Sequence, residues 1–140
     1  MGEIVRKIFL PIFASIMTTE LDAIRLALGI INDTPYSNYV ICSDSMSSVQ
    51  SIDNYTENNH LLHRLVYQMH ESILRGNHIT ISWVPSHVGI CGNESADQAA
   101  REAAMRPAEF IPVPHRDWFP LIKEKLIIFG TNLGEPKAES

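Results

Sequence analysis

The stretch Tyr39-Val-Ile-Cys-Ser-Asp44-Ser45 decides the fold class of this chain. Its four leading apolar residues, Tyr39–Cys42, form an unbroken run that predicts a strand buried on both faces, as is typical of a parallel sheet. The run leads into Asp44, and Ser45 is a suitable cap for a short helix that follows. A strand, an acidic residue and a helix in this order are the arrangement in which open α/β sheets place their sites, at the carboxyl end of a strand.

Segments with helical and strand periodicity surround this stretch. Upstream, Thr19 is expected to cap a helix whose buried stripe consists of Leu21, Ile24, Leu28 and Ile31. Downstream, residues 60–75 predict a second long helix, and the alternation in residues 78–84 predicts another strand. A last helix is expected to begin at Asn93 or Ser95. Strands that alternate with helices predict an α/β layered fold.

The two ends of the chain carry weaker patterns. Residues 4–14 are expected to form a strand that leads into the first helix. The apolar run at residues 8–17 resembles a signal peptide, but Pro11 interrupts it, and it is shorter than the ~20 residues that a membrane span needs. We expect one domain over residues 8–104. Residues 105–140 are expected to form a Pro-rich exit with a short helix and a frayed tail.

Composition limits the class of protein. The chain has 140 residues, 45% of them hydrophobic, which matches one folded domain and excludes a disordered tail. A net charge of −5 excludes a strongly basic nucleic-acid coat protein, although an enzyme that acts on nucleic acid remains compatible. The two cysteines, Cys42 and Cys91, predict reduced thiols in an intracellular protein without a membrane anchor, in the nucleus or the cytoplasm.

Three carboxylates stand at the ends of predicted elements. Glu20 is expected in the first turn of the first helix, Asp44 follows the buried strand, and Asp97 lies near the start of the last helix. If they meet in one cleft they repel one another unless a cation lies between them, and oxygen ligands of this kind select Mg²⁺ or Mn²⁺. Two such ions are the usual apparatus for phosphodiester cleavage. Taken singly, Glu20 and Asp97 are also explained by the helix macrodipole.

Histidines offer two further candidate sites. His87 lies in a glycine-containing loop before the Asp97 helix, where it is placed either to move protons or simply to face solvent. His60 and His63 are three residues apart on one helix, which allows zinc binding, but without a third ligand a solvated helix face is the simpler interpretation.

Three motifs together resemble a known family. The acidic motifs and histidine loop of type 1 ribonuclease H domains are similar, in order and spacing, to three segments of this chain: Ser15–Ile24, Cys42–Val49 and Trp83–Ala100. The sequence of residues 84–94 resembles that of the ribonuclease H domains attached to the reverse transcriptases of non-LTR retrotransposons; it reads Val-Pro-Ser-His-Val-Gly-Ile-Cys-Gly-Asn-Glu. The resemblance implies a ribonuclease H-like mixed sheet flanked by helices.

The resemblance also implies roles for individual residues. Glu20, Asp44 and Asp97 would be ligands of two Mg²⁺ or Mn²⁺ ions, and His87 would assist proton transfer or product release. Asn93 would contact the nucleic acid or orient the loop. The implied substrate is the RNA strand of an RNA–DNA hybrid, which the family distinguishes by its 2′-hydroxyl groups.

The chain departs from the family pattern at its start. The family places two antiparallel strands before the strand that leads into Glu20, and the first of them carries a fourth catalytic carboxylate, an Asp. Residues 1–14 contain no Asp. We therefore expect a domain that lacks the first two strands, of retroelement origin. Two alternatives stay open: a module that binds nucleic acid without cutting it, and an inert fragment that pairs through an exposed sheet edge with itself or with a complementing N-terminal segment.

Overall fold

Helices and strands alternate along the part of the chain that the computed structural model describes, which comprises residues 10–11, 14–34, 37–55, 59–105, 114 and 117. Their order is α1 (Ile16–Asn32), β1 (Asn38–Ser43), α2 (Met46–Asp53), α3 (His60–Leu74), β2 (His78–Trp83) and α4 (Cys91–Ala103). This order confirms the predicted α/β class. The predicted strand at residues 4–14 and the short helix predicted within residues 105–140 lie almost wholly outside the described residues.

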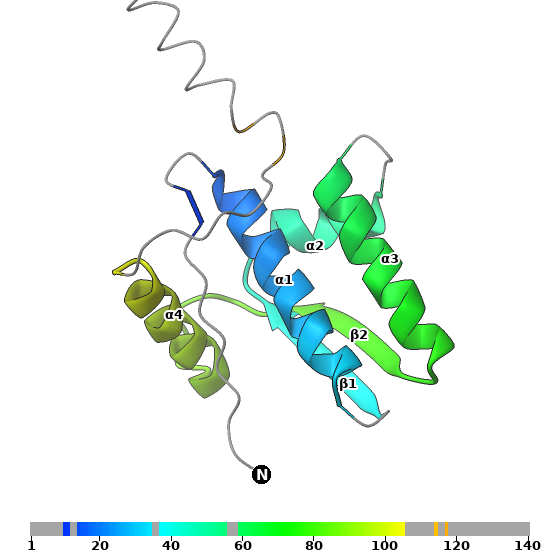
Figure 1. The fold of residues 1–140 in the computed structure, drawn as a ribbon. Helices are drawn as coiled ribbons and strands as arrows, with labels where there is room; N and C mark the ends of the chain where they lie inside the picture. The colour runs from blue at the N-terminus through cyan, green and yellow to red at the C-terminus, as the bar shows by residue number, and fades with distance from the viewer. Residues whose placement is uncertain are drawn as a thin grey trace, which may run out of the picture.

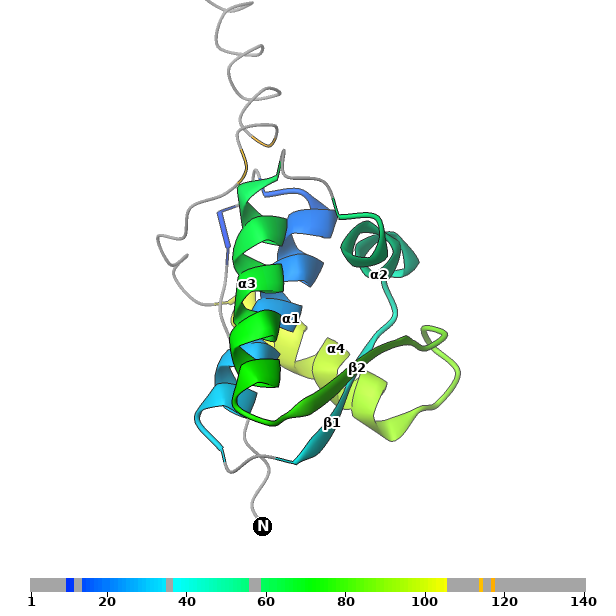
Figure 2. The same cartoon turned by 90° about the vertical axis from the view of Figure 1, so that its right-hand side faces the viewer.

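The two described strands form a parallel pair. Tyr39 is the register partner of Ile79, Ile41 of Ile81, and Ser43 of Trp83. Helices α1 and α3 lie side by side over one face of this pair, as Figures 1 and 2 both show, and α1 also packs against β1 while α3 packs against β2. Parallel strands joined through helices on the sheet face are the expected solution for an α/β chain.

The core lies between the two long helices and the strands. The stripe predicted on the first helix is confirmed, since all four of its residues are buried. They pack against the buried side of α3 and the inner face of β1. The buried members of this cluster are Leu21, Ile24, Leu28, Ile31, Ile41, Leu61, Leu62 and Leu65.

The prediction that Tyr39–Cys42 is buried on both faces is wrong. Val40 keeps 66% of its surface exposed and Cys42 is also exposed, whereas Ile41 is buried between them. Among the described residues α1 and α3 cover one face of the strands, so side chains that alternate along β1 meet either the core or the open face. Both cysteines are free thiols, as expected.

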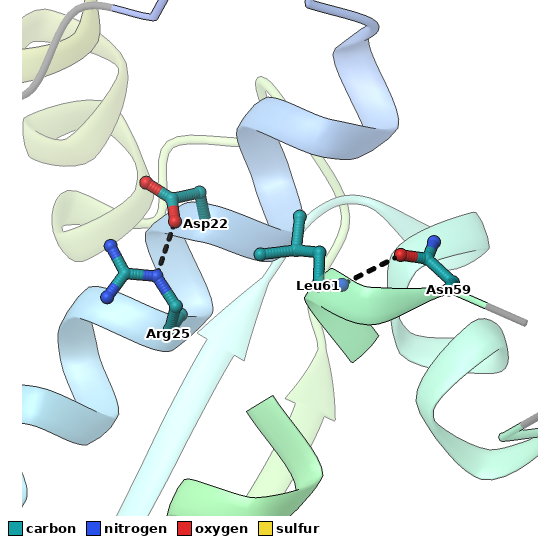
Figure 3. A network of polar contacts seen from close by, with 4 residues as sticks. All are labelled: Asp22, Arg25, Asn59 and Leu61. Atoms are coloured by element: carbon teal, nitrogen blue, oxygen red, sulfur yellow. Dashed lines mark hydrogen bonds and ion pairs between the residues drawn. The ribbon is translucent and has the colours of Figure 1, made fainter. Parts of the chain in front are cut away.

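Side chains cap the helices around the core. Asn59 Oδ1 accepts a hydrogen bond from the backbone N–H of Leu61 at the start of α3, at 3.0 Å (Figure 3). It also accepts one from the N–H of Leu62 at 3.4 Å. Ser45 caps α2, as the sequence predicts, through its hydroxyl and the N–H of Ser48. These bonds satisfy donors that a helix start otherwise leaves unpaired.

A buried asparagine connects the end of α3 to both strands. Gly76, at φ +93°, takes the left-handed conformation that ends the helix, and Asn77 follows it with 4% of its surface exposed. Asn77 Nδ2 donates to Ser72 Oγ at 2.9 Å, and its Oδ1 accepts from the N–H of Ser37, just before β1, at 3.1 Å. This side chain therefore holds three elements together at the edge opposite Asp44.

Helix α4 stands apart from the two-helix layer. In both views it lies beyond α1 from α3, and the loop after β2 connects it to the sheet (Figures 1 and 2). Ala103 is its one buried residue. Across the described residues, no helix has both the length and the apolar character needed to cross a membrane.

Candidate active site

The backbone around Asp44 is fixed by the end of β2. Asp44 immediately follows β1, and its carbonyl oxygen accepts a hydrogen bond from Trp83 Nε1 at 3.0 Å. The N–H of Val84 donates to the carbonyl of Ser43, also at 3.0 Å. The half-buried Asp44 side chain thus belongs to a short loop whose backbone is anchored on both sides.

Glu20 lies one turn farther into its helix than predicted. The expected cap at Thr19 is wrong, because Ser15 caps α1: its Oγ accepts from the N–H of Thr18 at 3.2 Å. The Thr19 hydroxyl instead donates to the carbonyl of Ile16 within the helix. Glu20 is therefore in the second turn, where the helix macrodipole no longer accounts for a carboxylate.

Helix α4 also begins earlier than predicted. It begins at Cys91 rather than at Asn93 or Ser95. Its N-cap residue is Ile90, whose side chain makes no capping hydrogen bond. Gly89, at φ +79°, turns the backbone into the helix. Asp97 consequently lies in the second turn of α4 and is half-buried.

His87 and Glu94 lie beside Asp97. His87 Nδ1 is 3.5 Å from Asp97 Oδ2, and one ligand atom from each of His87, Glu94 and Asp97 lies within 4.8 Å of the others. Asp97 Oδ2 is buried without a hydrogen-bond partner in the structure. Glu94 is not among the predicted site residues, although its position three residues before Asp97 puts both acids on one face of the helix.

Asn93 contacts the carboxylate of Asp44. Its Nδ2 donates a hydrogen bond to Asp44 Oδ2 at 3.2 Å, which joins α4 to the end of β1. The half-buried Asn93 lies four residues before Asp97, so one face of α4 carries both residues. In this structure Asn93 therefore orients an acidic side chain.

The charges of the other two predicted acids act on Glu20. The pKa of Glu20 is raised above its ordinary value, first by burial and then by the negative charges of Asp44 and Asp97. The three side chains come from α1, the end of β1 and α4, which are far apart in the sequence. We call Glu20, Asp44 and Asp97 the carboxylate cluster. Its mutual repulsion favours either protonation or a bound cation.

Asp22, which also lies on α1, is not part of the carboxylate cluster because it pairs with Arg25. Asp22 is buried, with 3% of its surface exposed, and its Oδ1 pairs with Arg25 Nε on α1 (Figure 3). Its charge is thus neutralised within the helix. Glu20 has no such cation among the causes of its raised pKa. His60 and His63 are both exposed, and neither belongs to a cluster that could hold a metal among the described residues.

The family model for RNase H matches residues 5–105. The chain belongs to the RNase H family. Its members are nucleases that bind RNA–DNA hybrids and depend on divalent metal ions. The match confirms the resemblance drawn from the motifs, and the mixed α/β architecture agrees with an RNase H-like fold.

The residues of this RNase H domain fit the metal ions on which the family depends. The carboxylate cluster supplies oxygen donors, the ligand type that Mg²⁺ and Mn²⁺ prefer. Among the described residues, the ligand atoms that already lie within 4.8 Å of one another are those of Asp97, Glu94 and His87, whereas Glu20 and Asp44 lie outside this group. The raised pKa of Glu20, and Asp97 Oδ2, which accepts no hydrogen bond and has only the imidazole of His87 at 3.5 Å, both indicate negative charge that a cation would compensate. A hard divalent cation would remove this repulsion.

Proposed function

We propose that this RNase H domain hydrolyses the RNA strand of RNA–DNA hybrids, with Mg²⁺ as the cofactor and Mn²⁺ as its substitute. The observation that carries the proposal is the carboxylate cluster, in which Glu20, Asp44 and Asp97 from three separate elements lie close enough to raise the pKa of Glu20. Burial is the largest cause of this raised pKa, and the negative charges of Asp44 and Asp97 add to it.

Each residue of the site has its own part in this proposal. Glu20, Asp44 and Asp97 would hold the metal ions, which when bound supply the positive charge that activates water and stabilises a leaving oxygen. Asn93 keeps the Asp44 carboxylate oriented through its amide. His87, whose side chain is 70% exposed, lies next to Asp97 on the solvent side and can carry a proton between the site and water.

The substrate follows from the same proposal. We infer recognition of RNA through its 2′-hydroxyl groups, which distinguish an RNA strand from DNA, and products with a 3′-hydroxyl and a 5′-phosphate. The sequence of residues 84–94 supports an origin in a retrotransposon reverse transcriptase. We also propose that residues 8–104 form the nuclease domain.

Cleavage of a labelled hybrid tests this proposal. The purified chain should cut the RNA strand only with Mg²⁺ or Mn²⁺ and leave duplex DNA intact. Asp44→Asn should lower the rate by about 10²-fold or more, since removal of one group that stabilises developing charge has an effect of that size. Asp53→Asn, an exposed acid at the end of α2, is the control and should leave the rate unchanged.

The role of His87 is tested in the same assay. His87→Ala should slow turnover by about 10²-fold, the low end for a proton-transfer group, because water can partly replace an exposed imidazole. Hybrid binding and the melting temperature should stay close to those of the unmodified chain. An unchanged rate would assign His87 to the ordinary surface residues.

A second candidate function is hybrid binding without cleavage. The observation in its favour is that the charges of two described carboxylates, Asp44 and Asp97, act on Glu20, whereas the resemblance implies a fourth acid. Salt-dependent binding of the hybrid, with no RNA product at any Mg²⁺ or Mn²⁺ concentration, would select this candidate. Absence of both binding and cleavage would contradict the two proposals together.

A further inference from the structure

A residue outside the family match contacts the start of the helix that carries Glu20. The match ends at residue 105, yet Asp117 Oδ2 accepts a hydrogen bond from the backbone N–H of Ser15 at 2.8 Å. Asp117 keeps 9% of its surface exposed, and its own N–H donates to the carbonyl of the buried Pro114 at 3.0 Å. The Asp117 carboxylate therefore lies at the start of α1.

The contact is electrostatically favourable for α1. The first turn of this helix contains no acidic residue of its own, so nothing within the helix complements the positive end of its dipole. The Asp117 carboxylate supplies that negative charge from 102 residues away in sequence, and it does so while largely removed from water. Charge-assisted hydrogen bonds of this kind are stronger than those between neutral groups.

A short path of bonds leads from Asp117 to Glu20. Ser15, held by Asp117, accepts from the N–H of Thr18, donates its hydroxyl to Thr18 Oγ1 at 3.0 Å, and accepts at its carbonyl from the N–H of Thr19. Glu20 follows Thr19 directly, at the start of the second turn. Helix ends fray unless their first donors are satisfied, so the position of Glu20 depends on this first turn.

We propose that Asp117 is a positioning residue of the active site: it anchors the start of α1 and thereby holds Glu20 in place toward Asp44 and Asp97. The inference rests on the proposed function, because the benefit of a fixed Glu20 is the binding of Mg²⁺. It also extends the functional unit beyond residue 105, where the family match ends.

Hydrogen exchange and Mg²⁺ titration of the full chain, both followed by NMR, test the two parts of this proposal. In Asp117→Ala the amide hydrogens of residues 15–20 should exchange about 2- to 30-fold faster, the range that corresponds to loss of a helix cap. Mg²⁺ affinity should fall about tenfold, the low end for a group that supports a metal ligand. The amide of Leu65, in the core of α3, should keep its exchange rate.

Two variants make the result specific. Asp117→Asn keeps an oxygen that can accept from Ser15, so it should restore most of the slow exchange and most of the affinity. If Asp117→Ala also speeds exchange at Leu65, this variant has unfolded the chain. The exchange at residues 15–20 and the Mg²⁺ affinity of Asp117→Asn, a more conservative variant, then test the proposal. Asp53→Ala removes an exposed acid from the end of α2 and should change neither quantity.

Three outcomes would overturn the proposal. Unchanged exchange at residues 15–20 in Asp117→Ala would remove the anchor. Faster exchange at these residues with unchanged Mg²⁺ affinity would show that Asp117 anchors the start of α1 but does not position Glu20 for metal binding. Absence of Mg²⁺ binding by the unmodified chain would contradict the proposed function and the positioning role together, and the exchange rates would still show whether the anchor exists.

Discussion

Glu20 is the residue at which function and stability oppose each other. Burial and the charges of Asp44 and Asp97 raise its pKa above the ordinary value of 4.5, so the folded chain binds this proton more tightly than the unfolded chain does. The contribution of Glu20 to the free energy of unfolding is therefore greatest below about pH 4.5 and is lost as the pH rises through the raised pKa. At neutral pH the ionised Glu20 destabilises the metal-free protein.

Replacement of Glu20 should consequently stabilise the metal-free chain. Glu20→Gln is expected to raise the melting temperature by a few degrees at pH 7 in the presence of a chelator, and to change it little at pH 4, where the unmodified side chain is protonated. Scanning calorimetry across this pH range measures the difference. Addition of Mg²⁺ should raise the melting temperature of the unmodified chain more than that of Glu20→Gln. A lower melting temperature for Glu20→Gln at pH 7 would contradict this account.

At the scale of elements, Asn77 is expected to control how α3 and the strands fit together. Asn77→Ala removes the partners of Ser72 Oγ and of the Ser37 N–H, one of them fully buried. Buried polar groups left unpaired cost about 1–3 kcal/mol, so the free energy of unfolding should fall by that amount. Urea denaturation measures it. Asn38→Ala, at the exposed start of β1, is the matched control and should stay within about 0.5 kcal/mol of the unmodified chain.

The sequence predicts which elements form better than where they begin. Apolar spacing identifies the buried stripe of α1, because burial of one helix face follows directly from the 3.6-residue period. It does not identify the cap, since Ser15 and Thr19 both suit that position chemically. Ser15 is the cap in the folded chain, and its N–H meets Asp117, a contact that no local pattern contains.

A similar limit applies to the strand and to the site. The unbroken run Tyr39–Cys42 reveals a strand, but only the packing of the helices decides that Ile41 is buried while Val40 is exposed. The motifs single out Asn93 without its contact to Asp44, because a hydrogen bond between α4 and the end of β1 depends on how α4 is placed.

For the whole molecule, the open side of β1 predicts self-association. Within the described residues β1 pairs only with β2, and Val40 presents an exposed apolar side chain on the uncovered face. Unpaired strand edges and apolar surface promote pairing with further strands. We expect reversible association that increases with protein concentration, and Val40→Lys should weaken it by about tenfold or more, since a charge opposes burial of this face.

Sedimentation of the two proteins across a range of concentrations measures this association. Leu74→Lys is the matched control, because Leu74 is an equally apolar residue with 73% of its surface exposed, but it lies at the end of α3, away from the strand edge. It should associate as the unmodified chain does. If the unmodified chain stays monomeric at every concentration, the predicted self-association through β1 is wrong.

The bond between Trp83 and the carbonyl of Asp44 gives the molecule an optical reporter of its own. Indole emission responds to the hydrogen bonding and polarity around its nitrogen, and here that nitrogen donates to the backbone carbonyl of Asp44, a member of the carboxylate cluster. The chain has two tryptophans, so a Trp118→Phe background would leave Trp83 as the single emitter. Its fluorescence would then register cation or nucleic-acid binding at this site without any attached dye.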